Sequence, residues 1–416
     1  ILTISFLLTF WISFAFGKVI AWINVYETKV VSQENHKLKI EFVVSNDGET
    51  FQDDIRYSVS LTKKDEKGNQ ILVDQKVYPE KITLAAKEKR QVSVEYEAPS
   101  FLDGEYDLWV RLANEIALPL GIGWAGKVKF QKETDFIEIL NQSCYLTIEK
   151  EPQKYPPPYG VDVKPEENLF LHCKVVNHFN ETKTVLPKFS TYLRLKVSGT
   201  LVKEEVLPEK ISFSPKEKRE IEILLPKVTT PQAYDAVLVF VDPSTKKEIS
   251  NEVVFHYVIS GESATLQNLL LDKESYQAGE EAKISFYWTG RADANPQGRL
   301  KDEVFKDLGS PKISLSILDK NDQVCAQTTF SPTSSLESFE TLAVKVGKDC
   351  QGAKVFAQIL GKDNKVLSQR EFKSPSYLAF KAKPQPSPLP PPKETKIPKN
   401  LLLVIFAFLI ICVLIF

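Results

Sequence analysis

The sequence predicts an all-β protein made of three tandem antiparallel β-sandwiches. Three observations predict this fold class: short segments alternate apolar and polar residues, one long segment recurs, and turn residues separate the alternating segments. Alternation with a period of two indicates one buried and one solvated face, as in an antiparallel sheet with a single core face. The length of 416 residues leaves room for about three domains of ordinary size.

The recurring segment sets the domain organisation. Residues 77–90, VYPEKITLAAKEKR, return 129 residues later as residues 206–219, VLPEKISFSPKEKR, and nine of the fourteen positions are identical. A period of this size is too long for a solenoid unit and matches one whole domain. We therefore predict a first module over 22–134 and a second module, its repeat, over 135–260.

The two modules are expected to contain corresponding strands. In the first module the alternating segments are 37–44, 55–61, 91–96 and 106–112, with turns at 46–48, 65–69 and 103–104. In the second module the segments are 169–176, 192–197, 220–224, 236–241 and 253–259. Many short strands at this spacing are typical of a β-sandwich.

A third, more diverged module is predicted over 261–380. Its strands are expected at 282–288, 313–318, 324–330, 354–360 and 366–372. Between the first two of these, residues 299–308 place apolar side chains on one helical face, at Leu300, Val304, Phe305 and Leu308. We expect a short inserted helix there, which either covers an open end of the sandwich or binds a partner.

The two ends of the chain are apolar. Residues 1–21 resemble the apolar region of a signal peptide, and an uncleaved membrane anchor is the alternative. Residues 381–399 are rich in proline and are expected to form an extended stalk. Residues 400–416 are predicted to form a transmembrane helix, although lysines precede it on the side assigned to the exterior. Because the first residue is not methionine and the last is apolar, we expect further residues at either end.

The cysteines favour an oxidising compartment. Cys144 and Cys173 lie close together within the second module, and Cys325 and Cys350 lie close together within the third. An even, local distribution predicts two disulfides, each contributing roughly 3 to 4 kcal/mol in the chain-entropy model. Reduced, buried cysteines remain the alternative.

Several short motifs carry a resemblance to a known class. They are Pro79-Glu80-Lys81 before a central strand, Asp103-Gly104-x-Tyr106 late in the first module, and Tyr276-x-x-Gly279-Glu280 in the third. The chain resembles the immunoglobulin-like sandwiches of bacterial and archaeal surface proteins, including the adhesion-related type, over most of residues 25–380. The resemblance is at the level of the fold. It implies a surface or envelope role and no fixed catalytic or binding residues.

Residue patterns of catalysis or metal binding are scarce. His172, Cys173 and His178 lie close in sequence but do not complete a set of four ligands. An acidic cluster at Asp47, Glu49, Asp53 and Asp54 lacks the spacing of a calcium loop and is better explained as a solvated loop. Lys and Arg (53) nearly balance Asp and Glu (54), so no global charge favours nucleic acid. We expect no enzymatic activity, no cofactor and no nucleic-acid partner.

Two segments are candidates for binding an unknown protein or carbohydrate partner. The apolar, glycine-rich segment 118–126 carries Ile122 and Trp124 and is expected to be a loop, which either binds a partner or packs between modules. The other candidate is the 299–308 insertion. Asn141 and Asn180 head triplets that accept N-linked glycans in organisms that attach them.

Together these features predict a single-pass membrane protein with its modules outside the cytoplasm, on the cell surface. The preferred function is non-enzymatic adhesion or structural display. An envelope accessory subunit that binds a membrane complex is the alternative, and wide apolar patches on module faces would favour it. A hydrolase-associated or metal-binding surface protein is a further alternative.

Overall fold

The computed structural model describes residues 22–48, 52–65, 68–114, 119–157, 159–273, 276–277, 279–289, 299–300, 311–332, 337–346, 350, 354–372 and 380–381. Within these ranges the protein is all-β, and its helical elements are short 3₁₀ turns. None of the helical turns in this part of the chain has the length and apolar character needed to cross a bilayer. The expected N-terminal signal or anchor, and everything after residue 381, lie outside the described residues.

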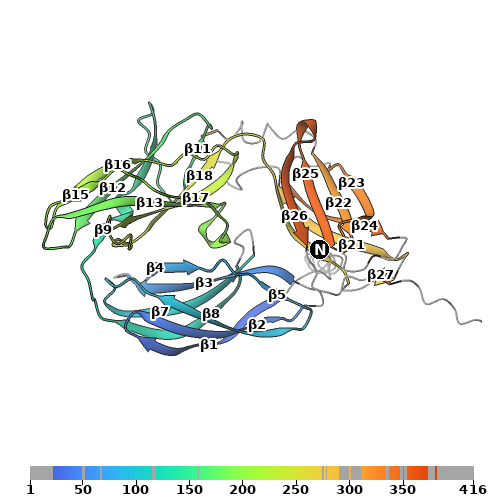
Figure 1. The fold of residues 1–416 in the computed structure, drawn as a ribbon, viewed down its shortest axis with the longest axis horizontal. Helices are drawn as coiled ribbons and strands as arrows, with labels where there is room; N and C mark the ends of the chain where they lie inside the picture. Colours follow the sequence, from blue (N-terminus) through green and yellow to red (C-terminus); the bar gives the residue numbers. More distant parts are fainter. Residues whose placement is uncertain are drawn as a thin grey trace, which may run out of the picture. The chain divides into compact units, whose positions relative to one another are not determined.

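The first group of strands forms two antiparallel sheets (Figure 1). One sheet has the order β1-β2-β6 and the other the order β4-β3-β7-β8, with β5 also paired to β3. The bounds are β1 Ile23–Glu34, β2 Lys37–Asn46, β3 Gln52–Lys64, β4 Gln70–Val77, β5 Ile82–Leu84, β6 Lys89–Glu97, β7 Gly104–Ala113 and β8 Pro119–Phe130.

The second group repeats this arrangement with additions at its edges. One sheet has the order β10-β12-β16 with β9 paired to β12, and the other has the order β11-β18-β17-β13-β14 with β15 paired to β13. The bounds are β9 Ile137–Ile139, β10 Tyr145–Ile148, β11 Val161–Val163, β12 Leu169–Asn177, β13 Lys183–Leu193, β14 Leu201–Val206, β15 Ile211–Phe213, β16 Lys218–Leu224, β17 Gln232–Val241 and β18 Val253–Ile259. Short 3₁₀ turns cover Asn141–Ser143 (η1) and Lys196–Ser198 (η2).

The third group has sheets of order β19-β21-β24 and β23-β22-β25-β26, and a parallel pair β20-β27. The bounds are β19 Thr265–Leu271, β20 Tyr276–Gln277, β21 Glu281–Thr289, β22 Lys312–Leu318, β23 Val324–Phe330, β24 Glu337–Lys345, β25 Lys354–Leu360, β26 Val366–Phe372 and β27 Phe380–Lys381. A 3₁₀ turn, η3, covers Lys362–Asn364.

The three groups share one strand order. In each group, one sheet has four neighbouring strands in the same order: β4-β3-β7-β8, β14-β13-β17-β18 and β23-β22-β25-β26. The facing sheet of each group contains an equivalent strand pair: β2-β6, β12-β16 and β21-β24. The third group therefore has the topology of the other two, although its sequence shows no copy of the 77–90 segment.

A separate hydrophobic cluster fills the space between the two sheets of each group. Its members are inward-facing side chains such as Phe42 and Leu108 in the first group, Phe189 and Phe255 in the second, and Trp288 in the third. Full burial of one such side chain contributes about 1.5–3 kcal/mol. The period-two alternation of the sequence follows from this arrangement, because every second residue of a strand reaches the cluster.

Both expected disulfides are present. Cys144, at the end of η1, is bonded to Cys173 in β12, and Cys325 in β23 is bonded to Cys350. Their Cα–Cα distances are 4.2 Å and 6.2 Å. Each bridge stays within one group of strands, so neither joins one sandwich to the next.

The segment 118–126 is not the loop that its glycines suggested. Residues 119–126 belong to β8, which pairs with β7 from one end to the other. The glycines have another cause, because β1 crosses the inner side of β8 at close range. A Cβ on Gly123 would lie 2.3 Å from Oγ1 of Thr28 and 3.4 Å from Cγ1 of Val25. Glycine allows this crossing without a shift of the Thr28 side chain.

Candidate functional site

The strand β8 turns two large apolar side chains toward solvent. Ile122 is 52% exposed and Trp124 is 53% exposed, whereas Gly123 and Ala125 between and beside them face inward. Opposite them in the register, Arg111 pairs with Ile122, and Trp109 pairs with Trp124. These residues form one outer surface of the β4-β3-β7-β8 sheet, which we call the tryptophan face: Ser58, Ser60, Thr62, Gln75, Asp107, Trp109, Arg111, Ile122 and Trp124.

A β-bulge keeps the two tryptophans on the same side. The register passes from Leu108–Gly126 to Trp109–Trp124, so Ala125 is the extra residue, and Gly126 next to it has a positive φ of 106°. Without this extra residue, Ala125 rather than Trp124 would lie opposite Trp109. Bulges of this kind redirect side chains and raise the local twist of the strand.

The two indoles are held across the neighbouring strands. Nε1 of Trp124 donates to Oδ1 of Asp107 on β7 at 3.2 Å, and Nε1 of Trp109 donates to Oγ1 of Thr62 on β3 at 3.0 Å. Both N–H groups are thus satisfied within the sheet, which leaves the exposed ring of Trp124 and the open part of the half-buried ring of Trp109 for contact with another molecule.

Polar side chains complete this surface. Nε of Arg111 donates to Oγ of Ser60 at 3.0 Å, and Nε2 of Gln75 donates to Oγ of Ser58 at 3.2 Å. Ser58, Ser60 and Thr62 are almost fully buried beneath these longer side chains. The tryptophan face therefore carries a hydrogen-bonded layer that is ordered before any ligand arrives.

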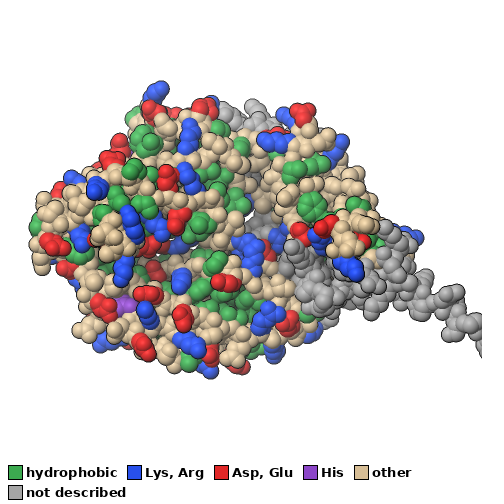
Figure 2. All heavy atoms as spheres, viewed as in Figure 1, with side chains coloured by type: hydrophobic (Ala, Val, Ile, Leu, Met, Phe, Trp, Pro, Cys, Tyr) green, Lys and Arg blue, Asp and Glu red, His purple; other side chains and the backbone are tan. Residues whose placement is uncertain are grey.

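The charges on the tryptophan face balance. Asp107 carries one negative charge and Arg111 one positive charge, and at the end of the strands Lys127 pairs with Glu105 at 2.6 Å. Over the side of the molecule seen in Figure 2, basic and acidic side chains are interspersed among apolar ones, without a large area of one sign. This arrangement is unsuited to a highly charged polymer.

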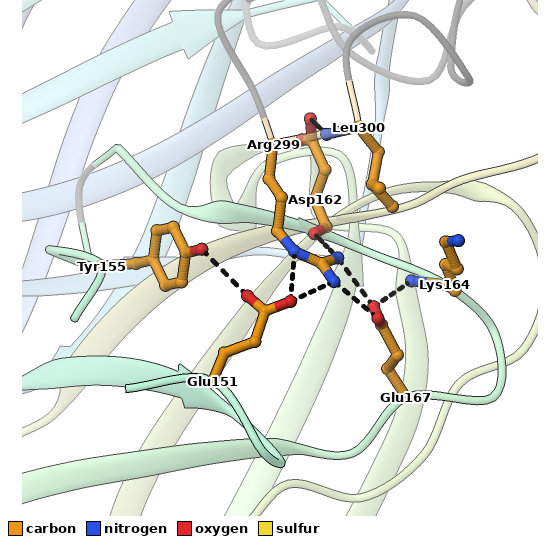
Figure 3. A network of polar contacts seen from close by, with 7 residues as sticks. All are labelled: Glu151, Tyr155, Asp162, Lys164, Glu167, Arg299 and Leu300. Atoms are coloured by element: carbon orange, nitrogen blue, oxygen red, sulfur yellow. Dashed lines mark hydrogen bonds and ion pairs between the residues drawn. The ribbon is translucent and has the colours of Figure 1, made fainter. Parts of the chain in front are cut away.

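The second candidate segment meets the middle sandwich through Arg299 (Figure 3). Its Nη2 donates to Oε1 of Glu151 at 2.5 Å and to Oε1 of Glu167 at 2.7 Å, and its Nη1 donates to Oε2 of Glu167 at 2.9 Å. Nε adds a further bond to Glu151 at 3.0 Å. The guanidinium forms paired bonds with two carboxylates, which is the strongest geometry for such groups.

Neighbouring groups hold Glu167 in place. The main-chain N–H of Lys164 donates to Oε2 of Glu167 at 2.8 Å. Burial raises the pKa of Glu167, but the hydrogen bonds from Arg299 and Lys164 outweigh it and lower the pKa below its ordinary value. The hydrogen bonds to Glu167 and Glu151 raise the pKa of Arg299, so Glu167 and Arg299 stay ionised at neutral pH.

Leu300 is only 8% exposed, and its main-chain N–H donates to Oδ2 of Asp162 at 3.3 Å. The side chain of Leu300 is therefore largely covered by the protein. Residues 299 and 300 lie in a turn rather than a helix. Val304, Phe305 and Leu308 lie outside the described residues. The Arg299 network is best understood as an anchor within the protein rather than as an open ligand site.

A small hollow lies beside this network in the second sandwich. Its volume is about 30 Å³, room for about one water molecule. Glu167, Lys164 and Tyr257 are among its lining residues. A substrate of ordinary size does not fit there.

The two histidines noted in the sequence, and Asp54 of the acidic cluster, have separate partners. His172 bonds to Thr147 at 2.8 Å, His178 bonds to Glu138 at 2.7 Å, and Cys173 is in a disulfide. Asp54 is buried and bonded to Arg56 and Lys81. In the part of the chain that the structure describes, no group of three or more His, Cys, Asp or Glu side chains could hold a metal ion.

The two glycosylation candidates are both exposed. Asn141 lies in η1, where its Nδ2 donates to the carbonyl of Glu252 at 3.2 Å, and Asn180 lies in the turn before β13. Both side chains are therefore accessible to a glycosylating enzyme.

A buried lysine joins the first two sandwiches, and no sequence pattern pointed to it. Nζ of Lys196, in η2, bonds to both oxygens of Glu252 at 2.5 and 2.6 Å and to the carbonyl of Gln75 in β4 at 2.9 Å. Lys196 is 8% exposed. Nearby, Nη1 of Arg56 donates to Oγ1 of Thr200 at 2.7 Å.

Two carboxyl groups close to this lysine have raised pKa values. Burial raises the pKa of Glu252, against the lowering effect of Lys196. Burial likewise raises the pKa of Asp74, which accepts a hydrogen bond from the hydroxyl of Tyr96 that lowers it in part. The junction between the first two sandwiches therefore contains titratable groups in an unusual environment.

Comparison with known proteins gives a likeness of fold. No family model and no curated protein matches the chain. It is similar to red sea bream transglutaminase, with 10% identity over 58% of this chain and 32% of that chain and a TM-score of 0.24. It is also similar to the tetra-tandem repeat in the extending region of a large adhesion protein, with 9% identity over 85% of this chain and 74% of that chain and a TM-score of 0.19.

A third similar structure is a β-glucuronidase of Bacteroides uniformis, with 11% identity over 60% of this chain and 28% of that chain and a TM-score of 0.23. The chain thus spans about a third or less of the two enzymes. The expectation that the protein is not an enzyme needs correction, because proteins with enzymatic activity are among those it resembles. The resemblance to tandem β-sandwich modules of surface proteins stands at the level of the fold, and these scores carry no activity or partner over to this chain.

Proposed function

We propose that this chain consists of three immunoglobulin-like sandwiches that act in adhesion or structural display at the cell surface. In this proposal residues 400–416 anchor the chain in the membrane and residues 381–399 form the stalk. The shared strand order of the three groups supports a modular spacer, since each module is a complete pair of sheets around its own core.

The proposal of an adhesive function is based on the tryptophan face. Trp124, 53% exposed, lies beside Ile122, 52% exposed, on a sheet whose polar groups are already paired, so two neighbouring large apolar side chains are available to another molecule. Aromatic residues are enriched where proteins bind partners.

The location is tested with intact cells that express the full-length gene. Added protease is expected to remove the modules without opening the cells, as shown by blotting with antibodies against each module. A cytosolic marker protein that survives the same treatment is the control. Modules protected until the membrane is opened would contradict a surface role and favour the second candidate.

The second candidate is an envelope accessory subunit that binds a membrane complex. The edge strands β4 and β14 favour it, because they expose apolar side chains at corresponding places: Ile71 and Leu72 in β4, and Leu201 and Val202 in β14. Exposed edges of this kind can pair with another chain.

Crosslinking in membranes distinguishes this candidate. Substitution of Leu72 and Leu201 by lysine places a charge on each edge strand, which opposes pairing with another chain and leaves the core clusters unchanged. If the chain is an accessory subunit, a crosslinked partner complex is lost in this double variant and kept in Trp124→Ala. The reverse pattern would favour the tryptophan face.

A further inference from the structure

We propose that the tryptophan face binds a neutral carbohydrate chain, with Trp124 and Trp109 as stacking surfaces for sugar rings. This inference rests on the proposed surface function and names the class of ligand. Its starting point is the cross-strand pair of tryptophans, which lie directly opposite each other on β8 and β7.

The first argument concerns the orientation of the indoles. The N–H of Trp124 is bonded to Asp107 and that of Trp109 to Thr62, so each ring is tied to the strand next to its own. Rings held in this way lose little freedom on binding, which removes one of the usual costs of association. The surface that remains available is the face of the ring rather than its polar edge, and a ring face suits the C–H surface of a pyranose.

The second argument concerns the surroundings of the rings. Sugar hydroxyls need both donors and acceptors, and Asp107, Arg111 and Gln75 supply a carboxylate, a guanidinium and an amide on the same surface. Oδ1 of Asp107 accepts the indole N–H of Trp124 at 3.2 Å, and a carboxylate offers several further acceptor sites. A wholly apolar ligand would desolvate these polar groups without replacing their bonds to water, at a cost in affinity.

The third argument concerns charge. The negative charge of Asp107 is balanced by the positive charge of Arg111, and farther along the strands the charge of Glu105 is balanced by that of Lys127. Neither an anionic polymer nor a strongly charged peptide finds a complementary field here. A ligand that combines a flat apolar surface with neutral hydroxyl groups matches both the rings and the balanced charge, and sugar rings have this combination.

The size of the apolar surface separates this ligand from a second protein. Ile122 and Trp124 are the exposed large hydrophobic residues of β8, and the rest of the tryptophan face is mainly polar. Stable protein interfaces bury about 800 Å² on each partner around an apolar centre. Two exposed apolar side chains in a polar layer are better matched to a narrow oligosaccharide.

The experiment measures binding of the full-length chain in detergent to an array of neutral and acidic oligosaccharides, followed by calorimetry with the neutral oligosaccharide that gives the strongest signal. Trp124→Ala is expected to weaken that binding about tenfold or more. Tyr159→Ala, which removes an exposed aromatic side chain from the second sandwich, is the matched control and is expected to leave it unchanged. Thermal melting checks that both variants stay folded.

The proposal is overturned if no neutral oligosaccharide binds, if only acidic ones bind, or if Trp124→Ala binds as well as the unmodified chain. It is also overturned if sedimentation shows that the chain self-associates through Trp124, since the face would then belong to a second copy. None of these outcomes depends on cellular location, so a failure here is distinct from a failure of the protease experiment.

Discussion

Asn46 and Asn177 occupy the same structural position in two successive sandwiches. Nδ2 of Asn46 donates to the carbonyls of Leu84 and Ala85 at 3.4 and 3.1 Å, and Nδ2 of Asn177 donates to those of Phe213 and Ser214 at 3.2 and 2.9 Å. Both asparagines are fully buried. Each fastens the end of one strand to the turn formed by the recurring sequence segment.

That turn is itself repeated. Glu88 accepts a bond from the N–H of Ala85 at 2.8 Å, and Glu217 accepts one from the N–H of Ser214 at 2.6 Å. The residue before each glutamate, Lys87 or Lys216, has a left-handed φ, 61° and 58°. The identical KEKR sequences are therefore explained by a turn that needs a particular glutamate, a left-handed residue and a distant asparagine.

The first prediction concerns the hydrogen bonds that Asn177 donates to the turn. Asn177→Ala removes the donor from three carbonyls, those of Glu181, Phe213 and Ser214, at a buried position, and we expect a loss of about 1–3 kcal/mol in the free energy of unfolding. Urea unfolding measures it. Asn180→Ala, an exposed asparagine nearby, is expected to change the free energy by less than about 0.5 kcal/mol. Equal effects of the two substitutions would contradict the role given to Asn177.

The second prediction concerns Arg299. Arg299→Ala leaves Glu151 and Glu167 facing each other without a cation, and we expect a loss of about 1–3 kcal/mol in the free energy of unfolding. Arg299→Lys keeps the charge but loses the paired geometry, so an intermediate loss is expected. Thermal melting and urea unfolding measure the effect.

Arg219 provides the control for this prediction. It is more exposed, pairs with Glu217 at 3.6 Å, donates to the carbonyl of Ser212 at 2.8 Å and lies over the ring of Phe213, so Arg219→Ala is expected to cost less than Arg299→Ala. If Arg299→Ala is no more destabilising than Arg219→Ala, the Arg299 network does not anchor its segment.

The third prediction concerns pH. Burial raises the pKa of Asp74 above its ordinary value of 3.8, so the folded protein binds this proton more tightly than the unfolded chain does. Its contribution to stability is greatest below pH 3.8 and is lost as the pH rises through the folded pKa. Asp74→Asn cannot ionise, and Asn can still accept the bond from Tyr96. Relative to the unmodified chain, this variant is expected to gain stability between about pH 4 and pH 7.

Urea unfolding at both pH values tests this sign. Asp135→Asn is a useful comparison, because the hydrogen bond from Lys132 lowers the pKa of Asp135, which gives the opposite dependence on pH. A stability difference between Asp74→Asn and the unmodified chain that does not change with pH would contradict the prediction.

The fourth prediction concerns the disulfides. Non-reducing peptide mapping is expected to recover Cys144 linked to Cys173 and Cys325 linked to Cys350. Replacing either pair by serine is expected to cost about 2–4 kcal/mol, because each bridge restricts the unfolded chain. Free thiols at all four positions in protein prepared without reductant would remove the argument for an oxidising compartment.

Much of the fold can be predicted because its signals are local. The period-two segments at 55–61 and 106–112 lie within β3 and β7, and the recurring segment lies at equivalent turns. The prediction of a loop over 118–126 is wrong because its glycines are typical of loops. Their actual cause is the close crossing of β1, a long-range contact that the sequence of β8 does not record.

The site is harder to predict for a similar reason. Trp124 stands out by its apolar context, but Trp109 looks like one more residue of an alternating strand. Only the register of β7 with β8, set by the bulge at Ala125, brings the two together. Lys196 carries no signal in the sequence, because a lone lysine is ordinarily solvated and its burial depends on Glu252 and Gln75.

The bonds that order the tryptophan face run from side chain to side chain: Trp124 to Asp107, Trp109 to Thr62 and Arg111 to Ser60. None of them contributes to the main-chain ladder that holds β3, β7 and β8 together. The residues that make these bonds can therefore be substituted together while the hydrogen bonds of the sheet are kept. The face is a natural place to build a combinatorial library, and we expect related chains to differ most in sequence there.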